Sequence, residues 1–140
     1  MKTALIVTIA LIVLVACVGA GMYLVIYAEY GPDREGNYVI EVVDGDTFKL
    51  MDGRIIRLLC VDTPEVDEPG YDKATKFLES LILWEEPIIE SNKKDKYDRD
   101  LAWVYVNNSN VEVFVNQEIV RLGFGDKFEY DGEDCSMMGI

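Results

Sequence analysis

Three carboxylates and an arginine are closely spaced in the segment 42–65, VVDGDTFKLMDGRIIRLLCVDTPE. Asp46, Asp62 and Glu65 fall at predicted strand ends or in loops, and Arg57 falls on a predicted strand. Carboxylate oxygens are hard ligands that suit Ca²⁺, and the forked guanidinium of arginine suits a phosphate. If the strands bring these side chains to one rim of a small sheet, the segment predicts a cation held next to a phosphate.

The elements that must position these side chains are predicted to be three short strands and two tight turns. The buried face of the strands is expected to consist of Phe48, Leu50, Ile56, Leu58 and Val61. Asp44-Gly45-Asp46-Thr47 marks the first turn and Asp52-Gly53 marks the second. The Asp-Gly pair predicts a type I′ turn, because both central residues of that turn need a positive φ.

The rest of the chain alternates helical and strand-like patterns. The predicted elements are a helix over 71–84, strands over 87–90 and 101–106, a polar loop over 91–100, a turn over 107–110 and a helix over 115–122. Pro87 and Gly123 are expected to end the two helical regions. Five strands with a helix between the third and the fourth are compatible with a small Greek-key barrel.

Several motifs together resemble the staphylococcal nuclease (thermonuclease) family. They are DGDT at 44–47, RLLCVDTPE at 57–65, DKYDRDLA at 95–102 and VNQEIVRLG at 115–123, in that order. The resemblance runs from about Tyr38 to about Gly123. It implies a mainly β fold, a five-stranded OB-fold barrel with packed helices, and Ca²⁺-dependent hydrolysis of DNA and RNA, with single-stranded or denatured substrate preferred.

The resemblance also implies a role for each matching residue. Asp46, Asp62 and the backbone carbonyl of Thr63 would hold Ca²⁺, Glu65 would activate water, Arg57 and Arg99 would grip the phosphate, and Lys96 and Tyr97 would contact a terminal phosphate. Each motif taken alone also has a purely structural interpretation, as a turn, a helix start, a cross-strand partner or a surface ion pair. Asp98 and Asp100 flank Arg99, so we expect them to pair with it in part.

Composition limits the function classes. The chain of 140 residues has 13 basic and 26 acidic residues, and the net charge of −13 disfavours tight, nonspecific binding of DNA. The absence of histidine excludes imidazole-based triads. The three cysteines, Cys17, Cys60 and Cys135, have no paired spacing, which argues against a disulfide framework or a zinc site. Cys60 is expected to be a small buried hydrophobic residue.

The first residues predict a membrane segment. Residues 3–28 carry no charge and are long enough to span a bilayer. We expect a single-pass anchor over 1–28 with the catalytic domain outside the cytoplasm. A cleaved signal, or a lipoprotein signal with lipidated Cys17, is the alternative. A linker over 29–37 and a nuclease domain over 38–125 would follow, in a monomeric protein.

The acidic tail over 126–140 departs from the resemblance. It is too short for the helix that family members usually carry there, so a frayed end is expected. The tail and the acidic charge keep a second hypothesis open beside the nuclease. In that hypothesis the chain is a catalytically inactive, membrane-anchored OB-fold module that binds nucleic acid or acts as a scaffold.

Overall fold

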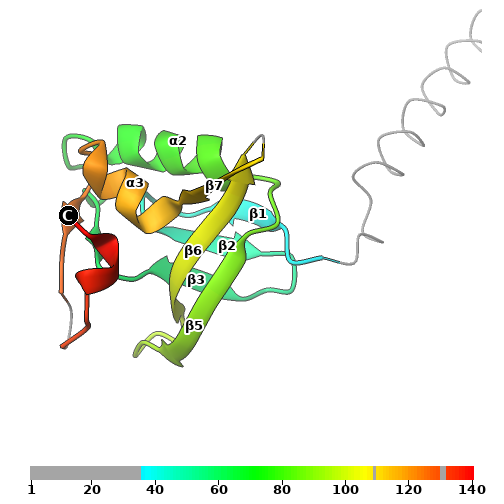
Figure 1. Cartoon of the computed structure of the whole chain (residues 1–140). Helices are drawn as coiled ribbons and strands as arrows, with labels where there is room; N and C mark the ends of the chain where they lie inside the picture. Colours follow the sequence, from blue (N-terminus) through cyan, green and yellow to red (C-terminus); the bar gives the residue numbers. More distant parts are fainter. Residues whose placement is uncertain (1–35, 109, 130–131) are drawn as a thin grey trace, which may run out of the picture. The chain divides into compact units, whose positions relative to one another are not determined.

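The computed structural model describes residues 36–108, 110–129 and 132–140 (Figure 1). The predicted anchor or signal over 1–28 and most of the predicted linker over 29–37 lie outside the described residues. Within the described part of the chain, no helix is both long enough and apolar enough to cross a membrane.

The described residues form a mainly β structure with two α-helices. The strands are β1 (Val39–Val42), β2 (Thr47–Leu50), β3 (Ile55–Leu58), β4 (Val61–Asp62), β5 (Ile88–Lys94), β6 (Asp100–Asn108), β7 (Val111–Phe114) and β8 (Asp126–Lys127). The helices are α2 (Tyr71–Ile82), α3 (Val115–Arg121) and the short 3₁₀-helix η1 (Ser136–Met138). Both α-helices pack against the sheet and against each other (Figure 1).

The main sheet brings distant parts of the sequence together. Its strand order is β1-β2-β3-β6-β5, with β7 added on β6, and β4 pairs separately with β8. All pairs are antiparallel except β3 with β6, which places Arg57 beside Leu101. The parallel pair therefore places β3, which carries Arg57, next to the segment that precedes β6. Among the described residues, the hydrogen-bonded strands follow one another from β1 to β5, and no ladder pairs β1 with β5.

The predicted apolar face is confirmed. Phe48, Leu50, Ile56, Leu58 and Val61 are all buried, and Leu78 and Ile82 of α2 join them. One buried polar residue, Asn116 of α3, connects the helix to the sheet. Its side chain accepts from Val104 N–H at 2.9 Å and donates to Leu59 O at 2.9 Å and Ala102 O at 3.0 Å. These bonds fix the chain between β3 and β4, where the predicted site begins.

Three local predictions differ from the structure. In the second turn only Gly53 has a positive φ, and Asp52 does not, so the turn is not type I′. Gly53 N–H bonds to Leu50 O and Leu50 N–H to Arg54 O, which gives a three-residue loop with glycine in the left-handed position. The predicted loop over 91–100 is also shorter than expected, because β5 continues to Lys94 as an exposed strand. The predicted turn over 107–110 is shorter than expected as well, because β6 extends to Asn108 and β7 begins at Val111.

The tail is not frayed where the structure describes it, and the expectation of no disulfide was wrong. Cys60 and Cys135 are bonded, with Cα atoms 5.7 Å apart, within the ordinary range for a disulfide. β8 pairs with β4 in the same region. Met138 is fully buried, and its carbonyl accepts from the Gln117 amide at 2.7 Å. These contacts fasten the chain end to the sheet and to α3.

Candidate active site

A pocket of about 470 Å³ lies where β3, β4, the β5–β6 loop and the C-terminal segment meet. Its lining residues are Arg57, Leu58, Cys60, Val61, Asp62, Lys93, Lys94, Asp95, Lys96, Tyr97, Arg99, Leu101, Phe128 and Glu133. Five predicted site residues are therefore together in one pocket: Arg57, Asp62, Lys96, Tyr97 and Arg99. Its volume is within the range of small-molecule sites.

Arg57 connects the predicted metal ligands to the backbone of the pocket. Its Nε lies 3.2 Å from Asp46 Oδ1, and its Nη2 lies 3.6 Å from Asp62 Oδ1. Its Nη1 donates to Leu58 O at 3.0 Å and to Val61 O at 2.7 Å. The guanidinium is thus held from three sides by oxygen atoms, which fixes its plane and its direction.

Asp46 is buried and accepts hydrogen bonds on both carboxylate oxygens. Oδ2 accepts from Thr63 N–H at 3.1 Å and from the Thr63 hydroxyl at 2.9 Å, while Oδ1 accepts from the Thr47 hydroxyl at 3.0 Å. With Arg57, these donors occupy the roughly four lone-pair directions of a carboxylate. Asp46 therefore holds the β4 end against the first turn.

The electrostatics of Asp46 are dominated by its burial. Removal from water raises the pKa of the Asp46 carboxyl to about 6, Arg57 opposes this shift, and the nearby Asp44 adds to it. A carboxyl with this pKa changes its charge just below neutral pH, in contrast to an exposed aspartate.

Two glycines allow the close approach of Thr63. A Cβ on Gly45 would lie 2.7 Å from Ala74 Cβ of α2 and 2.7 Å from Thr63 Oγ1. A Cβ on Gly125 would lie 2.7 Å from Asp62 O and 2.8 Å from Thr63 Cγ2. The glycine in the DGDT motif is therefore required by packing at the site.

Arg99 is paired with Asp95, and not with the flanking acids that the sequence pointed to. Arg99 Nε lies 2.7 Å from Asp95 Oδ2, and Arg99 N–H bonds to Asp95 Oδ1 at 3.0 Å. Asp98 pairs with Lys94, and Asp100 lies near Arg54 and Lys94. Burial alone would raise the pKa of Asp95, but the hydrogen bonds from Arg99 and Tyr97 N–H outweigh it and lower that pKa.

Lys96 and Tyr97 form the outer edge of the pocket on the same loop. Tyr97 is 67% exposed. Lys96 Nζ lies 4.9 Å and Arg99 Cζ 5.4 Å from the centre of its ring, so two cations lie near one aromatic ring. Asp95 also accepts from Tyr97 N–H at 2.8 Å, so a single carboxylate organises this whole loop.

The predicted metal ligands and the predicted base are less closely grouped. Asp46 and Thr63 are buried and do not line the pocket, whereas the Asp62 side chain is 53% exposed and lines it. Glu65 lies in the exposed loop after β4, does not line the pocket, and gives its N–H to Glu68 Oε2 at 2.8 Å. Among the described residues, no three acidic, cysteine or histidine side chains are grouped as they would be to hold a metal ion.

Positive charge is concentrated at the pocket despite the net charge of −13. Arg57, Lys93, Lys94, Lys96 and Arg99 line it, which is five of the chain's 13 basic residues. The acidic residues in the lining are Asp62, Asp95 and Glu133. A local excess of cations can attract a phosphate to one site on an acidic protein.

None of the site residues predicted from the sequence belongs to the chain end. Phe128 and Glu133 line the pocket, and Cys60 lines it through the disulfide to Cys135. Lys93 and Lys94 were missed as well, because they were assigned to a loop and belong to β5. The spacing of carboxylates and arginines is a local signal, so it could identify the site residues of the first motifs. No local pattern connects Cys60 with Cys135, which is 75 positions away.

The chain is similar in sequence to a known protein family and to several known proteins. Residues 55–136 match the sequence model of the staphylococcal nuclease homologue family, so the match includes most of the C-terminal segment. An uncharacterized protein of Methanocaldococcus jannaschii is 36% identical over 130 residues, covering 70% of this chain and 62% of the relative. An uncharacterized endonuclease of Escherichia coli O157:H7 is 32% identical over 99 residues, covering 69% of this chain and 63% of the relative.

A further relative is endonuclease YncB of Bacillus subtilis. It is 33% identical over 95 residues, covering 59% of this chain and 45% of the relative. The chain therefore spans less than two thirds of the length of each of these three relatives.

Proposed function

Because the chain belongs to the staphylococcal nuclease homologue family, we propose that it is an endonuclease that hydrolyses phosphodiester bonds in DNA and RNA. The observation that carries the proposal is the presence of Arg57 and Arg99 in one pocket with three lysines. Arg57 lies on β3 and Arg99 directly precedes β6, and the parallel β3–β6 pair brings these two segments together. The relatives named endonuclease support the same reaction class.

The pocket residues suit the charge changes of this reaction. As water attacks the phosphorus, negative charge grows on the phosphate oxygens, and arginine donors aimed at that charge lower the barrier. Removing one such donor typically slows a reaction by about 10²–10³. Glu65 remains the proposed general base, since it is exposed on the loop directly after Asp62. Lys96 and Tyr97 are proposed to contact a second phosphate at the pocket edge.

Ca²⁺ is the proposed cofactor, and the donor types fit it. Asp46, Asp62 and the Thr63 carbonyl offer hard oxygen ligands without nitrogen or sulfur. The four donors already on Asp46 mean that the ion would replace one of them, and Arg57 is the positive partner it would compete with. When bound, the ion would supply charge relief at the phosphate. Its binding is testable without activity, because Ca²⁺ should raise the free energy of unfolding more for wild type than for Asp62→Asn.

An oxidising compartment is the proposed location. The Cys60–Cys135 disulfide supports it, because structural disulfides persist mainly outside reducing cytosol. The uncharged run over 3–28 supports a membrane tether or an exported protein, with cleavage or lipidation of Cys17 as alternatives. Extracellular calcium levels would suit a weak site.

The decisive experiment measures cleavage of single-stranded and denatured DNA by the full chain, with Ca²⁺ and with a chelator. Glu65→Gln is the test variant, and Asp67→Asn in the same exposed loop is the matched control. Calcium-dependent cleavage that Glu65→Gln lowers by orders of magnitude, and that Asp67→Asn keeps, supports the nuclease and its base. Folded protein that cuts neither DNA nor RNA with any divalent cation refutes the proposal.

A noncatalytic binding module is the second candidate. Two contacts favour it: Asp46 is fully occupied by protein donors, and Arg99 is paired with Asp95. Such a module would bind nucleic acid at the same cationic pocket without cutting it. Binding that persists in Glu65→Gln, with no cleavage by wild type, would support this candidate over the enzyme.

A further inference from the structure

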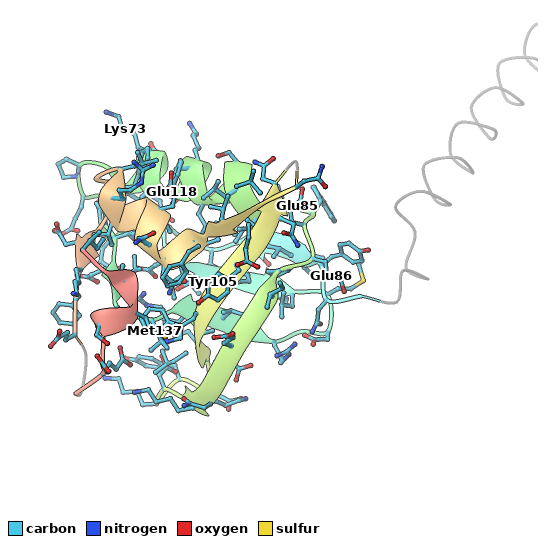
Figure 2. All side chains as sticks on the ribbon, in the orientation of Figure 1. Lys73, Glu85, Glu86, Tyr105, Glu118 and Met137 are labelled. Atoms are coloured by element: carbon cyan, nitrogen blue, oxygen red, sulfur yellow. A yellow bond between two sulfur atoms is a disulfide. The ribbon has the colours of Figure 1, made fainter. Side chains whose placement is uncertain are left out.

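Three aromatic side chains lie side by side on the outer face of β6 and β7. The rings of Trp103 and Phe114 meet edge to face with their centres 5.7 Å apart, and the ring of Tyr105 stacks on that of Phe114 at 4.8 Å. Ile88 of β5 lies directly opposite Tyr105 in the ladder, so it extends the same row. We call these four residues the aromatic face, and Figure 2 labels Tyr105 among them.

The alternation of side chains along β6 explains why these rings lie outside the core. Ala102, Val104 and Val106 are at most 1% exposed, so the residues between them face the other side of the sheet. The three rings are half-buried, and Ile88 is 46% exposed. Grouped aromatic side chains at a protein surface are typical of interfaces with other proteins, where they supply contact area.

Two carboxylates flank the aromatic face. Glu90 lies opposite Trp103 in the β5–β6 ladder, and Glu112 lies opposite Asn107 in the β6–β7 ladder. Opposite residues share a face, so both glutamates border the rings. Burial, together with the charges of Glu90 and Glu112, raises the pKa of the Tyr105 phenol, which places both carboxylates within electrostatic reach of this ring. Among the described residues, no hydrogen bond or ion pair engages either carboxylate.

A second cavity, of about 550 Å³, opens at one end of the aromatic face. Trp103 and Glu90 line it, and Asp134 adds a further carboxylate. Lys93 lines it too, but its Nζ lies 3.1 Å from Glu133 Oε1, so this cation is compensated within the lining. The cavity therefore keeps an excess of negative charge next to an indole ring. That combination suits the side chain of an arginine.

Charge decides which kind of partner fits this face. The net charge is −13, so a second copy of this chain would bring like charge against Glu90 and Glu112. A nucleic acid would bring phosphates against the same two carboxylates. A basic polypeptide is attracted instead. Arginine is the cation that both stacks on aromatic rings and pairs with carboxylates through a planar fork.

We propose that the aromatic face docks a basic segment of a partner protein, whose arginine side chains lie against the rings and pair with Glu90 and Glu112. The inference goes beyond the proposed function and does not depend on it, because neither the aromatic face nor its two glutamates line the candidate active-site pocket.

The dimensions of the sheet define the spacing of the arginines. Neighbouring strands lie about 4.8 Å apart and residues rise about 3.3 Å along a strand, which separates the Cα atoms of Glu90 and Glu112 by about 16 Å. Two arginines four residues apart in an extended peptide are separated by about 13 Å, and their long side chains can cover the difference. A short peptide with this spacing is therefore the probe.

The first test measures binding of the labelled peptide acetyl-GSRGSGRSG-amide to the full chain by fluorescence anisotropy, at about 0.15 M salt, where remote charges are screened. We expect Glu90→Lys/Glu112→Lys to weaken binding at least about tenfold, because like charges would then face each other. Glu41→Lys/Glu79→Lys is the matched control. It changes the net charge equally at two exposed glutamates of β1 and α2, so it should alter the affinity by less than about twofold.

The second test separates the effect of the rings from that of the charges. Its probe is the same peptide with both arginines replaced by lysine, which keeps the charge and loses the planar fork. Wild type should bind the arginine peptide about fivefold more tightly than the lysine peptide. Trp103→Leu should bring the two affinities close to equality. The ratio is measured within one variant, so an unfolded fraction of Trp103→Leu cancels from it.

The outcomes decide the inference independently of catalysis. Peptide binding that falls in Glu90→Lys/Glu112→Lys while DNA cleavage stays unchanged, with an arginine preference that Trp103→Leu removes, supports it. Wild type that does not bind the arginine peptide, or an equal loss of affinity in the two double variants, overturns it. An arginine preference that survives in Trp103→Leu overturns it as well. A wild-type dimer in sedimentation that Glu90→Lys/Glu112→Lys dissociates would assign the face to a second copy, and would also overturn it.

Discussion

Arg57 Nε lies 3.2 Å from Asp46 Oδ1, so the predicted phosphate-binding arginine and a predicted metal ligand are one ion pair. Both side chains are largely buried: the exposed fraction is 17% for Arg57 and 7% for Asp46. Because a buried charge needs a partner, neither residue can lose the other at low cost. The pair therefore has a structural role as well as its proposed chemical one, and variants must distinguish the two.

Arg57→Lys should lower both the rate of DNA cleavage and the free energy of unfolding, and the two losses can be measured separately. Lysine has no planar fork and cannot reach Asp46, Asp62 and two backbone carbonyls at once. We expect kcat/KM for DNA cleavage to fall by about 10²–10³. The loss of the carbonyl contacts should lower the free energy of unfolding by about 1–3 kcal/mol. Steady-state kinetics and urea unfolding measure the two effects separately.

Arg54→Lys is the matched control for Arg57→Lys. Arg54 pairs with Asp52 at 2.8 Å on the exposed turn before β3 and does not line the pocket. Its substitution should change neither quantity appreciably, since exposed ion pairs contribute about 0–1 kcal/mol. If Arg57→Lys were less stable but cut DNA at the wild-type rate per folded molecule, Arg57 would be a structural residue only.

Asp95→Asn tests whether the ion pair with Asp95 orients Arg99 for binding a phosphate or keeps it from binding one. Asp95 receives Arg99 Nε at 2.7 Å as well as the N–H groups of Arg99 and Tyr97, so it holds the loop in shape. We expect orientation to dominate and kcat/KM to fall by about tenfold, because a misplaced donor is costly in catalysis. Asp98→Asn removes the same charge from a side chain that is 85% exposed, and it should have little effect. A rise in activity for Asp95→Asn would contradict the orienting role.

The sequence predicted the parts of this molecule that depend on local pattern. The helix over 71–84 is confirmed as Tyr71–Ile82, and the apolar faces of β2 and β3 are buried as expected. The predicted strand ended too early, at residue 90, because Ser91–Lys94 of β5 is exposed and its residues are all polar. Such a segment shows no alternation of apolar and polar residues. β7 was missed because it is four residues long and directly follows asparagine-rich turn signals.

The pocket depends on contacts that no local pattern contains. Arg57 and Arg99 could be named from their motifs, but their shared pocket requires the parallel pairing of β3 with β6. The contribution of Phe128 and Glu133 to the pocket depends on the disulfide between Cys60 and Cys135. An odd number of cysteines without regular spacing argued against such a bond. The partner of Arg99 was missed for a similar reason. Asp98 and Asp100 are nearer in sequence, but the loop turns Asp95 toward the guanidinium.

Gly45→Ala should damage the site through packing. The added Cβ would lie 2.7 Å from Thr63 Oγ1 and from Ala74 Cβ, so α2 or Thr63 must move. We expect a loss of about 1–3 kcal/mol in the free energy of unfolding, typical of overpacking, together with reduced cleavage as Thr63 shifts from Asp46. Gly53→Ala is the control: its φ of +90° adds strain, but no atom lies within 4 Å. It should lower stability and leave kcat/KM unchanged in the folded protein.

Asp46 should make stability fall as pH rises from about 4 to about 7 in protein freed of divalent cations by a chelator. Its pKa is about 6 in the folded protein, above the ordinary value of 3.8, because burial disfavours the charged form. The folded state therefore holds this proton more tightly than the unfolded chain does. The stabilising contribution is complete below about pH 4, is lost as pH rises through 6, and stays lost above it. Two pKa units correspond to about 3 kcal/mol at most.

Asp46→Asn should abolish this slope, since an amide does not titrate. The measurement is the free energy of unfolding in urea at pH 4.5 and at pH 7.5, compared between wild type and the variant. Asp72→Asn, an exposed carboxylate in the first turn of α2, is the matched control and should keep the wild-type slope. The same slope in wild type and Asp46→Asn would mean that another group carries the pH dependence. In that case water at the carboxylate, or a stronger effect of Arg57 than the 3.2 Å distance suggests, must offset the effect of burial on the pKa of Asp46.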